Sequence, residues 1–360
     1  MKKKSLFAYA DRRITVAAIV LAIFGSLMVA SAEMGNSAGD TGYLTGIIIR
    51  QVIYVIVGFG VYYVLIRLRV YRLRNYLFWA ASAVIGLLLL STRLFGQIGG
   101  AYAWIRLPAG ATLQPSEFAK IFMIGFGGKL LGTDRKDRNM DVFRHYGITA
   151  FVFFLIIALY QHDFGSGIVL FVICYCVMLI PGYKQLRPVQ NIMKGLVIVA
   201  VGLVLLFMSK PFTELLKAHA DNYMVGRFLA AADPFLYQYD NGYHLIMSLV
   251  SFANGGFFGL GYGNSIHKYI NFLLPVIVEE LGIAGFIGLV AMYTLMLYPV
   301  IAGSLRTQIT GSKIVLLGVF IYFIVHFILN VGGVSGLIPL TGVPLLMISS
   351  GGSSLMASLG

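Results

Sequence analysis

Two ionisable residues, Glu117 and Lys120, lie three positions apart in a segment that is otherwise largely apolar. On a helix this spacing brings both side chains to one face. Ionisable groups at membrane depth are costly, so they usually face the protein interior or a water-filled cavity and mark a functional site. Two interpretations stay open: an internal ion pair that locks two helices together, and a polar cavity wall in which Lys120 faces an anionic ligand.

Three other stretches carry side chains suited to binding. Asp163 follows an apolar run, and it either caps the next helix or faces an outer cavity, where it binds a cation or orients a substrate. Glu279 and Glu280 come early in an apolar run, where acidic groups either complement the dipole of a helix N-terminus or face something other than lipid. Ser350 and Ser353 belong to a run of small residues that either allows close helix packing or lines a cavity, where both serines are candidates for binding substrate.

A polar loop at residues 210–272 holds a dense group of ionisable side chains. Arg227 is a candidate for bidentate binding of phosphate, with a surface salt bridge as the alternative. His244 is a candidate for proton transfer near neutral pH. Glycines at 255, 256, 259, 261 and 263 predict unusual backbone angles, either in a tight re-entrant turn or close to a ligand. The ionisable residues include Glu214, Lys217, Asp221, Arg227, Asp233, Asp240, His244 and Lys268.

The composition predicts the elements that must position these residues. Only 11% of the residues are charged and the mean hydropathy is +0.85, whereas soluble domains carry about 25% charged residues. Apolar runs near 20 residues match a hydrocarbon core of about 30 Å when helical, and they lack the alternation of barrel strands. We therefore predict an all-α integral membrane protein, with residues 1–360 forming one polytopic domain of about ten transmembrane helices.

The predicted spans are 14–32, 46–66, 76–92, 115–131, 146–161, 165–181, 191–209, 273–300, 314–336 and 338–360. The first lacks a clear cleavage site and is expected to be a retained anchor. No basic residue follows the last span, so we expect the natural chain to continue beyond it.

Basic residues set the predicted orientation. With these spans, 19 of the 27 lysines and arginines lie in loops and span ends on one side. The positive-inside rule then places both termini in the cytoplasm and residues 210–272 outside as one large extracytoplasmic loop. The formal net charge of +13 is thus interpreted as a signal for membrane topology and not as a surface that binds nucleic acid. Cys174 and Cys176 point to different helix faces, which disfavours a disulfide or a metal site.

Several motifs in one order carry a resemblance to a known family. The chain resembles the SEDS family (shape, elongation, division and sporulation), typified by FtsW and RodA, over nearly its whole length, and it leans towards the FtsW-like branch. The motifs are Gly99-Gly100 with Trp104-Ile105, Gln114-Pro115-Ser116-Glu117-Phe118-Ala119-Lys120, Asp163-Phe164-Gly165, Asp233-Pro234, Gly242-Tyr243 with Ser248, Gly255-Gly256 through Gly263-Asn264-Ser265, Glu279-Glu280-Leu281-Gly282, and Pro339 to Ser354.

The resemblance implies a peptidoglycan glycosyltransferase of the bacterial cytoplasmic membrane. It would polymerise lipid II, an undecaprenyl-pyrophosphate-linked disaccharide-pentapeptide, for cell division or cell shape. Its expected partners are a class B penicillin-binding protein and other division or elongation proteins. Arg227 and Lys120 would contact phosphates, Asp163 and Glu117 would shape the cavity, and Glu279 or Glu280 would support the loop. A divalent cation is the candidate cofactor, because the leaving pyrophosphate needs positive charge.

The family's expected catalytic base is not found in this chain. The family usually places an Asp in a Pro-x-x-x-Thr-Asp-Phe-Ile stretch before Glu-Glu-Leu-Gly. An ungapped alignment puts Asn271 at that position, but an amide is no proton acceptor at neutral pH. We favour an alignment anchored on Lys268 and Tyr269, in which Pro275 is the motif's proline and the stretch after it is missing. The catalytic residue is therefore unassigned between Tyr269 and Glu279.

Two other functions fit the same residues. A lipid II flippase would use the buried polar groups without a base. A non-catalytic scaffold would bind and activate the penicillin-binding protein. Neither involves nucleic acid.

Overall fold

The fold is built almost entirely from helices. The structure is a computed structural model that describes residues 11–34, 41–68, 74–107, 112–207, 212, 214, 216–217, 223–239, 242–266, 272–349 and 351–359. The two short strands, β1 (Ile105–Arg106) and β2 (Thr112–Leu113), pair antiparallel. The helices are α1 (Arg12–Glu33), α2 (Thr41–Leu68), α3 (Asn75–Ser91), α4 (Pro115–Leu131), α5 (Asn139–Leu155), α6 (Phe164–Leu179), α7 (Arg187–Phe207), α9 (Tyr223–Ala232), α10 (Tyr243–Gly255), α11 (Leu273–Arg306), α12 (Thr310–Val334) and α13 (Gly352–Leu359).

The prediction of an all-α membrane protein is confirmed. Within the described residues, six helices are long and apolar enough to cross a bilayer: Arg12–Glu33, Gly42–Leu65, Tyr76–Phe95, Asn139–Tyr160, Leu273–Arg306 and Thr310–Val334. The predicted span at 115–131 coincides with α4, and the other predicted spans before residue 337 each overlap a helix. The total of ten spans stays a prediction.

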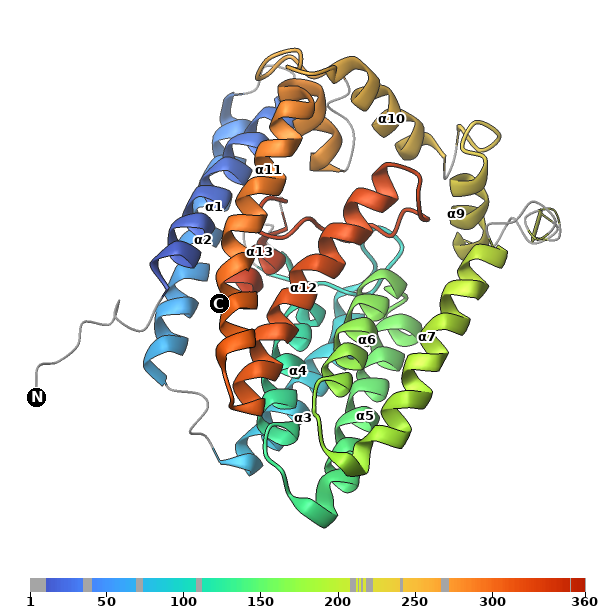
Figure 1. The fold of residues 1–360 in the computed structure, drawn as a ribbon. Helices are drawn as coiled ribbons and strands as arrows, with labels where there is room; N and C mark the ends of the chain where they lie inside the picture. Colours follow the sequence, from blue (N-terminus) through green and yellow to red (C-terminus); the bar gives the residue numbers. More distant parts are fainter. Residues whose placement is uncertain are drawn as a thin grey trace, which may run out of the picture.

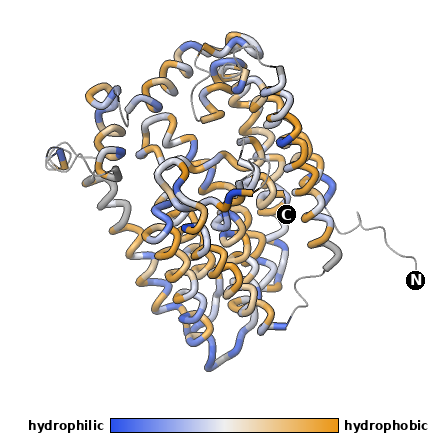
Figure 2. The backbone as a smooth tube through the Cα atoms, turned by 180° about the vertical axis from the view of Figure 1, so that it is seen from behind, coloured by the Kyte–Doolittle hydropathy of each residue, from blue (hydrophilic) through white to orange (hydrophobic). Residues whose placement is uncertain are grey.

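The helices form an elongated bundle whose two ends differ. The turn between α4 and α5 lies at the lower tip of Figure 1, while α10 and the start of α11 lie at the upper end. The lower tip is hydrophilic, and orange, hydrophobic chain fills much of the bundle above it (Figure 2). The predicted outer loop at 210–272 includes the helices α9 and α10, and α10 packs against α11. The single-domain assignment remains an expectation.

The predicted tenth span at 338–360 is wrong. Helix α12 ends at Val334, and among the described residues beyond it only the eight of α13 are helical. The described chain directly after α12, residues 335–349, is hereafter the irregular segment. Gly336 and Gly342 adopt φ angles of 77° and 73°, which favour glycine and interrupt a helix, and Pro339 and Pro344 each lack a backbone donor.

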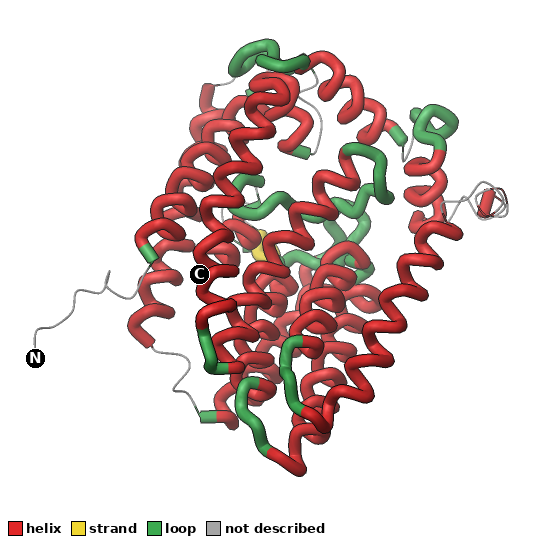
Figure 3. The backbone as a smooth tube through the Cα atoms, viewed as in Figure 1, coloured by secondary structure: helices red, strands yellow, loops and turns green. Residues whose placement is uncertain are grey.

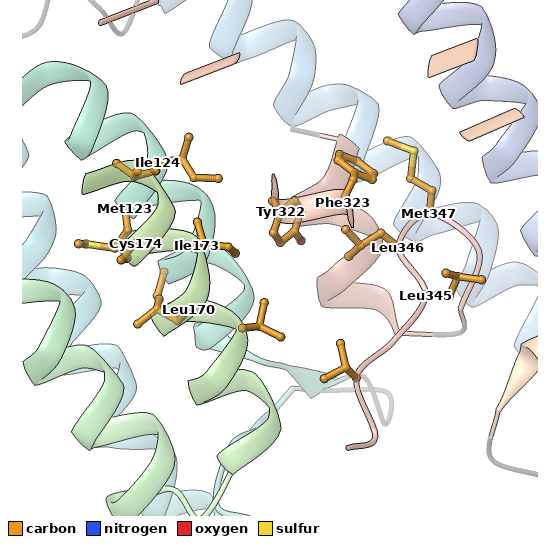
Figure 4. Close-up of a cluster of buried hydrophobic side chains, with 14 of the residues drawn as sticks. Met123, Ile124, Leu170, Ile173, Cys174, Tyr322, Phe323, Leu345, Leu346 and Met347 are labelled. Atoms are coloured by element: carbon orange, nitrogen blue, oxygen red, sulfur yellow. The ribbon is translucent and has the colours of Figure 1, made fainter. Parts of the chain in front are cut away.

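The second half of the irregular segment, from Val343 to Ile348, lies largely inside the bundle, whereas Leu337 in its first half is exposed. Figure 3 shows the segment as loop surrounded by helices. Leu345, Leu346 and Ile348 are buried. In Figure 4, residues 345–347 lie near Tyr322 and Phe323 of α12, in a cluster that also draws on α4 and α6. Non-helical backbone at membrane depth is tolerated when protein encloses it.

Gly25 of α1 allows this segment to pack closely. A Cβ at Gly25 would lie 2.5 Å from the Ile348 Cα and 2.8 Å from its carbonyl oxygen. Both are backbone atoms, so no side chain can turn away to make room. The approach of α1 to the irregular segment therefore requires glycine at this position.

We expect Gly25→Ala to lower the free energy of unfolding by about 1–3 kcal/mol, because the added methyl group overpacks the contact. The measurement is a denaturant titration in detergent, followed by circular dichroism. Gly60→Ala in α2 is the matched control, since its Cβ would meet nothing within 4 Å. Equal changes in the two variants would contradict the close contact.

Candidate functional site

Glu117 and Lys120 form an ion pair inside the bundle. Helix α4 begins at Pro115, which suits a helix start because its missing N–H would have no intrahelical partner there. One turn later, the Lys120 Nζ lies 2.7 Å from the Glu117 Oε1, and both side chains are 0% exposed. The structure thus places the two residues together as an internal ion pair, which was the first of the two alternatives considered for them.

Helix α12 supplies the other members of this group. The His326 Nδ1 lies 2.8 Å from the Tyr322 carbonyl oxygen. A carbonyl only accepts, so Nδ1 carries the proton and the Nε2 of a neutral ring accepts from Lys120 at 3.3 Å. The Tyr322 hydroxyl lies 3.4 Å from the Glu117 Oε2. Together, Glu117, Lys120, Tyr322 and His326 join α4 to α12, and we call them the central network.

Neither His326 nor Tyr322 was predicted from the sequence as a site residue. A signal for His326 existed, since it is an ionisable residue inside a run of strongly apolar sequence. Tyr322 had no comparable signal, because an aromatic residue in such a run is unremarkable.

Asp163 caps a helix. Its side chain accepts from the backbone N–H of Ser166 at 3.1 Å at the start of α6, as one of the two interpretations held. The Gln114 side chain donates to the Asp163 Oδ2 at 2.7 Å. The Gln114 backbone N–H donates to the Ser353 Oγ at 2.8 Å. Gln114 therefore ties together the starts of α4, α6 and α13, although it was not among the predicted site residues.

Glu279 and Glu280 are fully buried, each with its own hydrogen-bond donors. The Glu279 carboxylate accepts from Ser251 at 3.2 Å, Asn254 at 3.2 Å and Ser265 at 2.6 Å. The proposal that they complement a helix N-terminus is wrong, because the first turn of α11 contains no acidic residue.

The Glu280 carboxylate accepts from the Ser31 hydroxyl of α1 at 2.6 and 2.7 Å. The backbone N–H of Gly263 donates in turn to the Ser31 Oγ at 3.2 Å. Glu280 therefore connects α11, through Ser31, to both α1 and the loop that holds the glycines at 255–263, which we call the glycine-rich loop.

The glycines at 255–263 fit against a break in α11. Gly282 has φ 70° and ψ −169° within that helix, and a Cβ there would lie 2.3 Å from the Phe257 carbonyl oxygen. The backbone N–H groups of Leu260 and Gly261 donate to the carbonyls of Glu279 and Glu280, both at 2.9 Å. The predicted unusual angles are present, since Gly256, Gly259, Gly261 and Gly263 all have positive φ. In this structure the glycine-containing backbone closely approaches α11.

Arg227 holds the irregular segment. Its Nη1 donates to the Leu340 carbonyl oxygen at 2.9 Å. Asn330 of α12 donates to the Val343 carbonyl at 2.8 Å, and the Tyr293 hydroxyl of α11 donates to the Leu346 carbonyl. Side chains from three helices thus donate hydrogen bonds to backbone carbonyls of the irregular segment, which have no partner within a helix.

His244 lies half-buried on α10, with its ring 6.2 Å from that of Phe272. Burial, and secondarily the charge of Arg227, lower the pKa of His244 below 6.5. The ring is therefore neutral at pH 7 and adds no positive charge near Arg227.

Three residues discussed above and the candidate cation have no place in the described site. Lys268 and Ser350 are outside the described residues, as is Asn271. Among the residues that the structure describes, no three His, Cys, Asp or Glu side chains are grouped so that they could hold a metal ion. The candidate divalent cation therefore has no ligand set assigned to it.

Comparison with known proteins gives one family over nearly the whole chain. A family model of cell cycle proteins, FtsW, RodA and SpoVE, matches residues 11–360. Among the similar proteins is the probable peptidoglycan glycosyltransferase FtsW of Bacillus subtilis, 30% identical over 375 residues, with 100% of this chain and 90% of the relative covered. The equivalent proteins of Coxiella burnetii (29% identical, 99% and 95% covered) and Geobacter metallireducens (31% identical, 97% and 92% covered) are similar too.

Solved structures show the same fold. A chain from a peptidoglycan synthase complex that coordinates polymerization and crosslinking matches with a TM-score of 0.72 at 22% identity, covering 97% of this chain and 94% of that one. The rod shape determining protein RodA of Thermus thermophilus matches with a TM-score of 0.64 at 21% identity, covering 97% and 93%.

We expect Lys120→Met to lower the free energy of unfolding by about 3–5 kcal/mol, because it leaves the Glu117 carboxylate buried without its counter-charge. Denaturant unfolding in detergent measures the loss. The double variant Glu117→Gln with Lys120→Met should lose less than the sum of the single changes. Arg144→Met is the control, since its ion pair with Asp141 is exposed and such pairs contribute about 1 kcal/mol or less. Strictly additive losses would contradict the coupling.

Proposed function

The chain belongs to the FtsW, RodA and SpoVE family of cell cycle proteins, and from this premise we propose that it polymerises the glycan strand of peptidoglycan from lipid II and releases undecaprenyl pyrophosphate. One observation carries the proposal: relatives that align with 97–100% of this chain at 29–31% identity are named peptidoglycan glycosyltransferases. The predicted activity as a peptidoglycan glycosyltransferase agrees with these relatives.

The protein is a multi-pass membrane protein, and we propose that its termini face the cytoplasm of a bacterium. The distribution of basic residues supports this orientation. It places α9, α10 and the glycine-rich loop on the outer side, where the lipid-linked sugars would be joined.

The chemistry requires a proton acceptor and a positive centre. A base must take the proton of a sugar hydroxyl as that hydroxyl attacks the anomeric carbon, and the leaving pyrophosphate must be stabilised. Arg227 is the better candidate for the phosphates, because it lies half-buried beside the irregular segment. Lys120 is enclosed by Glu117 and His326, which favours a role in positioning α4 and α12.

The roles of the other predicted residues follow from their contacts. Asp163 would fix the start of α6 and so shape one wall of the site. Glu279 and Glu280 would hold the glycine-rich loop against α11 through their side chains and carbonyls. These are positioning roles, because each carboxylate is occupied by donors from the protein.

A class B penicillin-binding protein is the proposed partner. Support comes from the fold, which is shared with a chain of a peptidoglycan synthase complex. Coupling the two enzymes would place new glycan directly beside the activity that cross-links it.

Arg227→Ala is expected to lower the rate of lipid II polymerisation about tenfold to a hundredfold, the equivalent of one lost charge-assisted hydrogen bond. The measurement uses purified protein with its partner and fluorescent lipid II. Arg227→Lys keeps the charge but loses the planar fork, and should recover part of the rate. Lys217→Ala is the control, because its ion pair with Glu214 is exposed. Wild-type rates for Arg227→Ala would remove this residue from the site.

The missing base gives a second prediction. Inserting an x-x-x-Thr-Asp-Phe-Ile stretch after Pro275, which restores the family's spacing, should raise the polymerisation rate by about 10²–10⁴-fold, the usual contribution of a positioned base. An insertion of the same length with Asn in place of Asp controls for loop length. If both insertions leave the rate of the natural chain unchanged, the base lies elsewhere in this protein.

The two rival functions are separate outcomes of these assays. Movement of lipid II across proteoliposomes without glycan product would identify a flippase. A stable complex with the penicillin-binding protein and no polymer would identify a scaffold.

A further inference from the structure

An open depression of about 460 Å³ lies at the end of the bundle opposite α10. Trp79 of α3, Leu130 of α4, Val142 and His145 of α5, and Arg135 of the turn between α4 and α5 line it. This turn forms the lower tip of the molecule in Figure 1. The depression is separate from the central network and from the glycine-rich loop, so the proposed polymerisation does not account for it.

Arg135 brings an uncompensated positive charge to the depression. Within the described part of the chain, its guanidinium has no hydrogen-bond or ion-pair partner. Its backbone N–H donates to the Asn139 Oδ1 at 2.8 Å, and its carbonyl oxygen accepts from the Arg138 N–H at 3.2 Å. Two of the three nearby carboxylates, those of Asp134 and Asp141, have other partners, and the third, Asp137, is exposed. Asp134 accepts from the Asn139 Nδ2 at 2.7 Å, and Asp141 pairs with Arg144 at 2.6 Å. An anion entering the depression would therefore meet a cation that is not already neutralised.

His145 is the second polar residue of the lining. Its Nδ1 lies 2.6 Å from the Asp141 carbonyl oxygen, which only accepts, so Nδ1 carries the proton. The ring lies edge-on to Trp79, with 6.2 Å between centroids. His145 and Arg135 thus line one hollow together with the indole.

The rest of the lining is apolar and lies where a membrane surface is expected. Leu130 ends a span and Val142 begins one, and tryptophan is enriched at the boundary between lipid and water. Trp79 is further fixed by an edge contact with Phe126 at 5.0 Å. A hollow with a cation at its rim and apolar walls towards the bilayer matches a phosphodiester that continues into acyl chains.

We propose that this depression binds the head group of an anionic phospholipid, with Arg135 on the phosphate and Trp79, Leu130 and Val142 against the glycerol and upper acyl chains. Free phosphate would gain nothing from the apolar walls. A zwitterionic head group would bring its own cation towards Arg135, which disfavours it.

The test uses Trp79 as a local probe. The sequence has two tryptophans, so Trp104→Phe leaves Trp79 as the single emitter. This protein is placed in phosphatidylcholine nanodiscs that contain a minor fraction of phosphatidylglycerol brominated near the top of its acyl chains. We expect this lipid to quench Trp79 with an apparent affinity about fivefold above that of equally brominated phosphatidylcholine, the effect of one arginine near the surface.

Two variants decide whether the site or the general charge of the loop is responsible. Arg135→Gln should abolish the preference, and Arg144→Gln, which removes an exposed arginine of the same region, should keep it. Equal quenching by both lipids, or equal losses in both variants, would overturn the proposal. Reversal of the quenching by inorganic phosphate would assign the site to a free anion and overturn it as well.

A second measurement avoids the tryptophan substitution. The wild-type chain and both variants are extracted from the same mixed-lipid membranes, and the retained phospholipid is identified by mass spectrometry. Phosphatidylglycerol should be enriched with wild type and Arg144→Gln, and lost with Arg135→Gln. Retention unchanged by Arg135→Gln would overturn the proposal.

Discussion

A peptide carbonyl inside a bilayer has no water to bond, so any chain that leaves a helix there must find donors within the protein. This constraint governs the irregular segment at residues 335–349. Arg227, Asn330 and Tyr293 reach its carbonyls from three different helices. The break in α11 at Gly282 meets the same demand differently, because the backbone of the glycine-rich loop pairs with the helix on both sides of the break. Two departures from helical structure are thereby held in fixed shapes.

The buried charges obey a related rule. A carboxylate in the interior requires a counter-charge or hydrogen-bond donors from the protein. Glu117 has Lys120, Glu279 has three side-chain donors, and Glu280 has Ser31. The contact between Ser31 and Glu280 bridges two helices that are far apart in sequence, α1 and α11. Together these contacts give a polymerase rigid polar walls, which suits chemistry that depends on holding a hydroxyl and an anomeric carbon in a fixed relation.

Local sequence predicted most of the helices but failed where the backbone departs from them. The span at 115–131 was found correctly, because Pro115 marks its start and the apolar residues that follow have no break. The span at 338–360 failed, because its hydropathy is as high as that of a helix while its glycines adopt angles that end one. Hydropathy reports the absence of water around a segment, and an enclosed irregular chain satisfies that condition as well as a helix does.

The amino-acid sequence by itself determined that this is an all-α membrane protein, which family it resembles, and that Glu117 and Lys120 share a face. Those features depend on composition and on neighbours within a few positions. Only the tertiary structure decided that Ser31 is the partner of Glu280, that His326 completes the central network, and that Gly25 admits the irregular segment. Such contacts join residues hundreds of positions apart, and they depend on how helices pack, which no local pattern encodes.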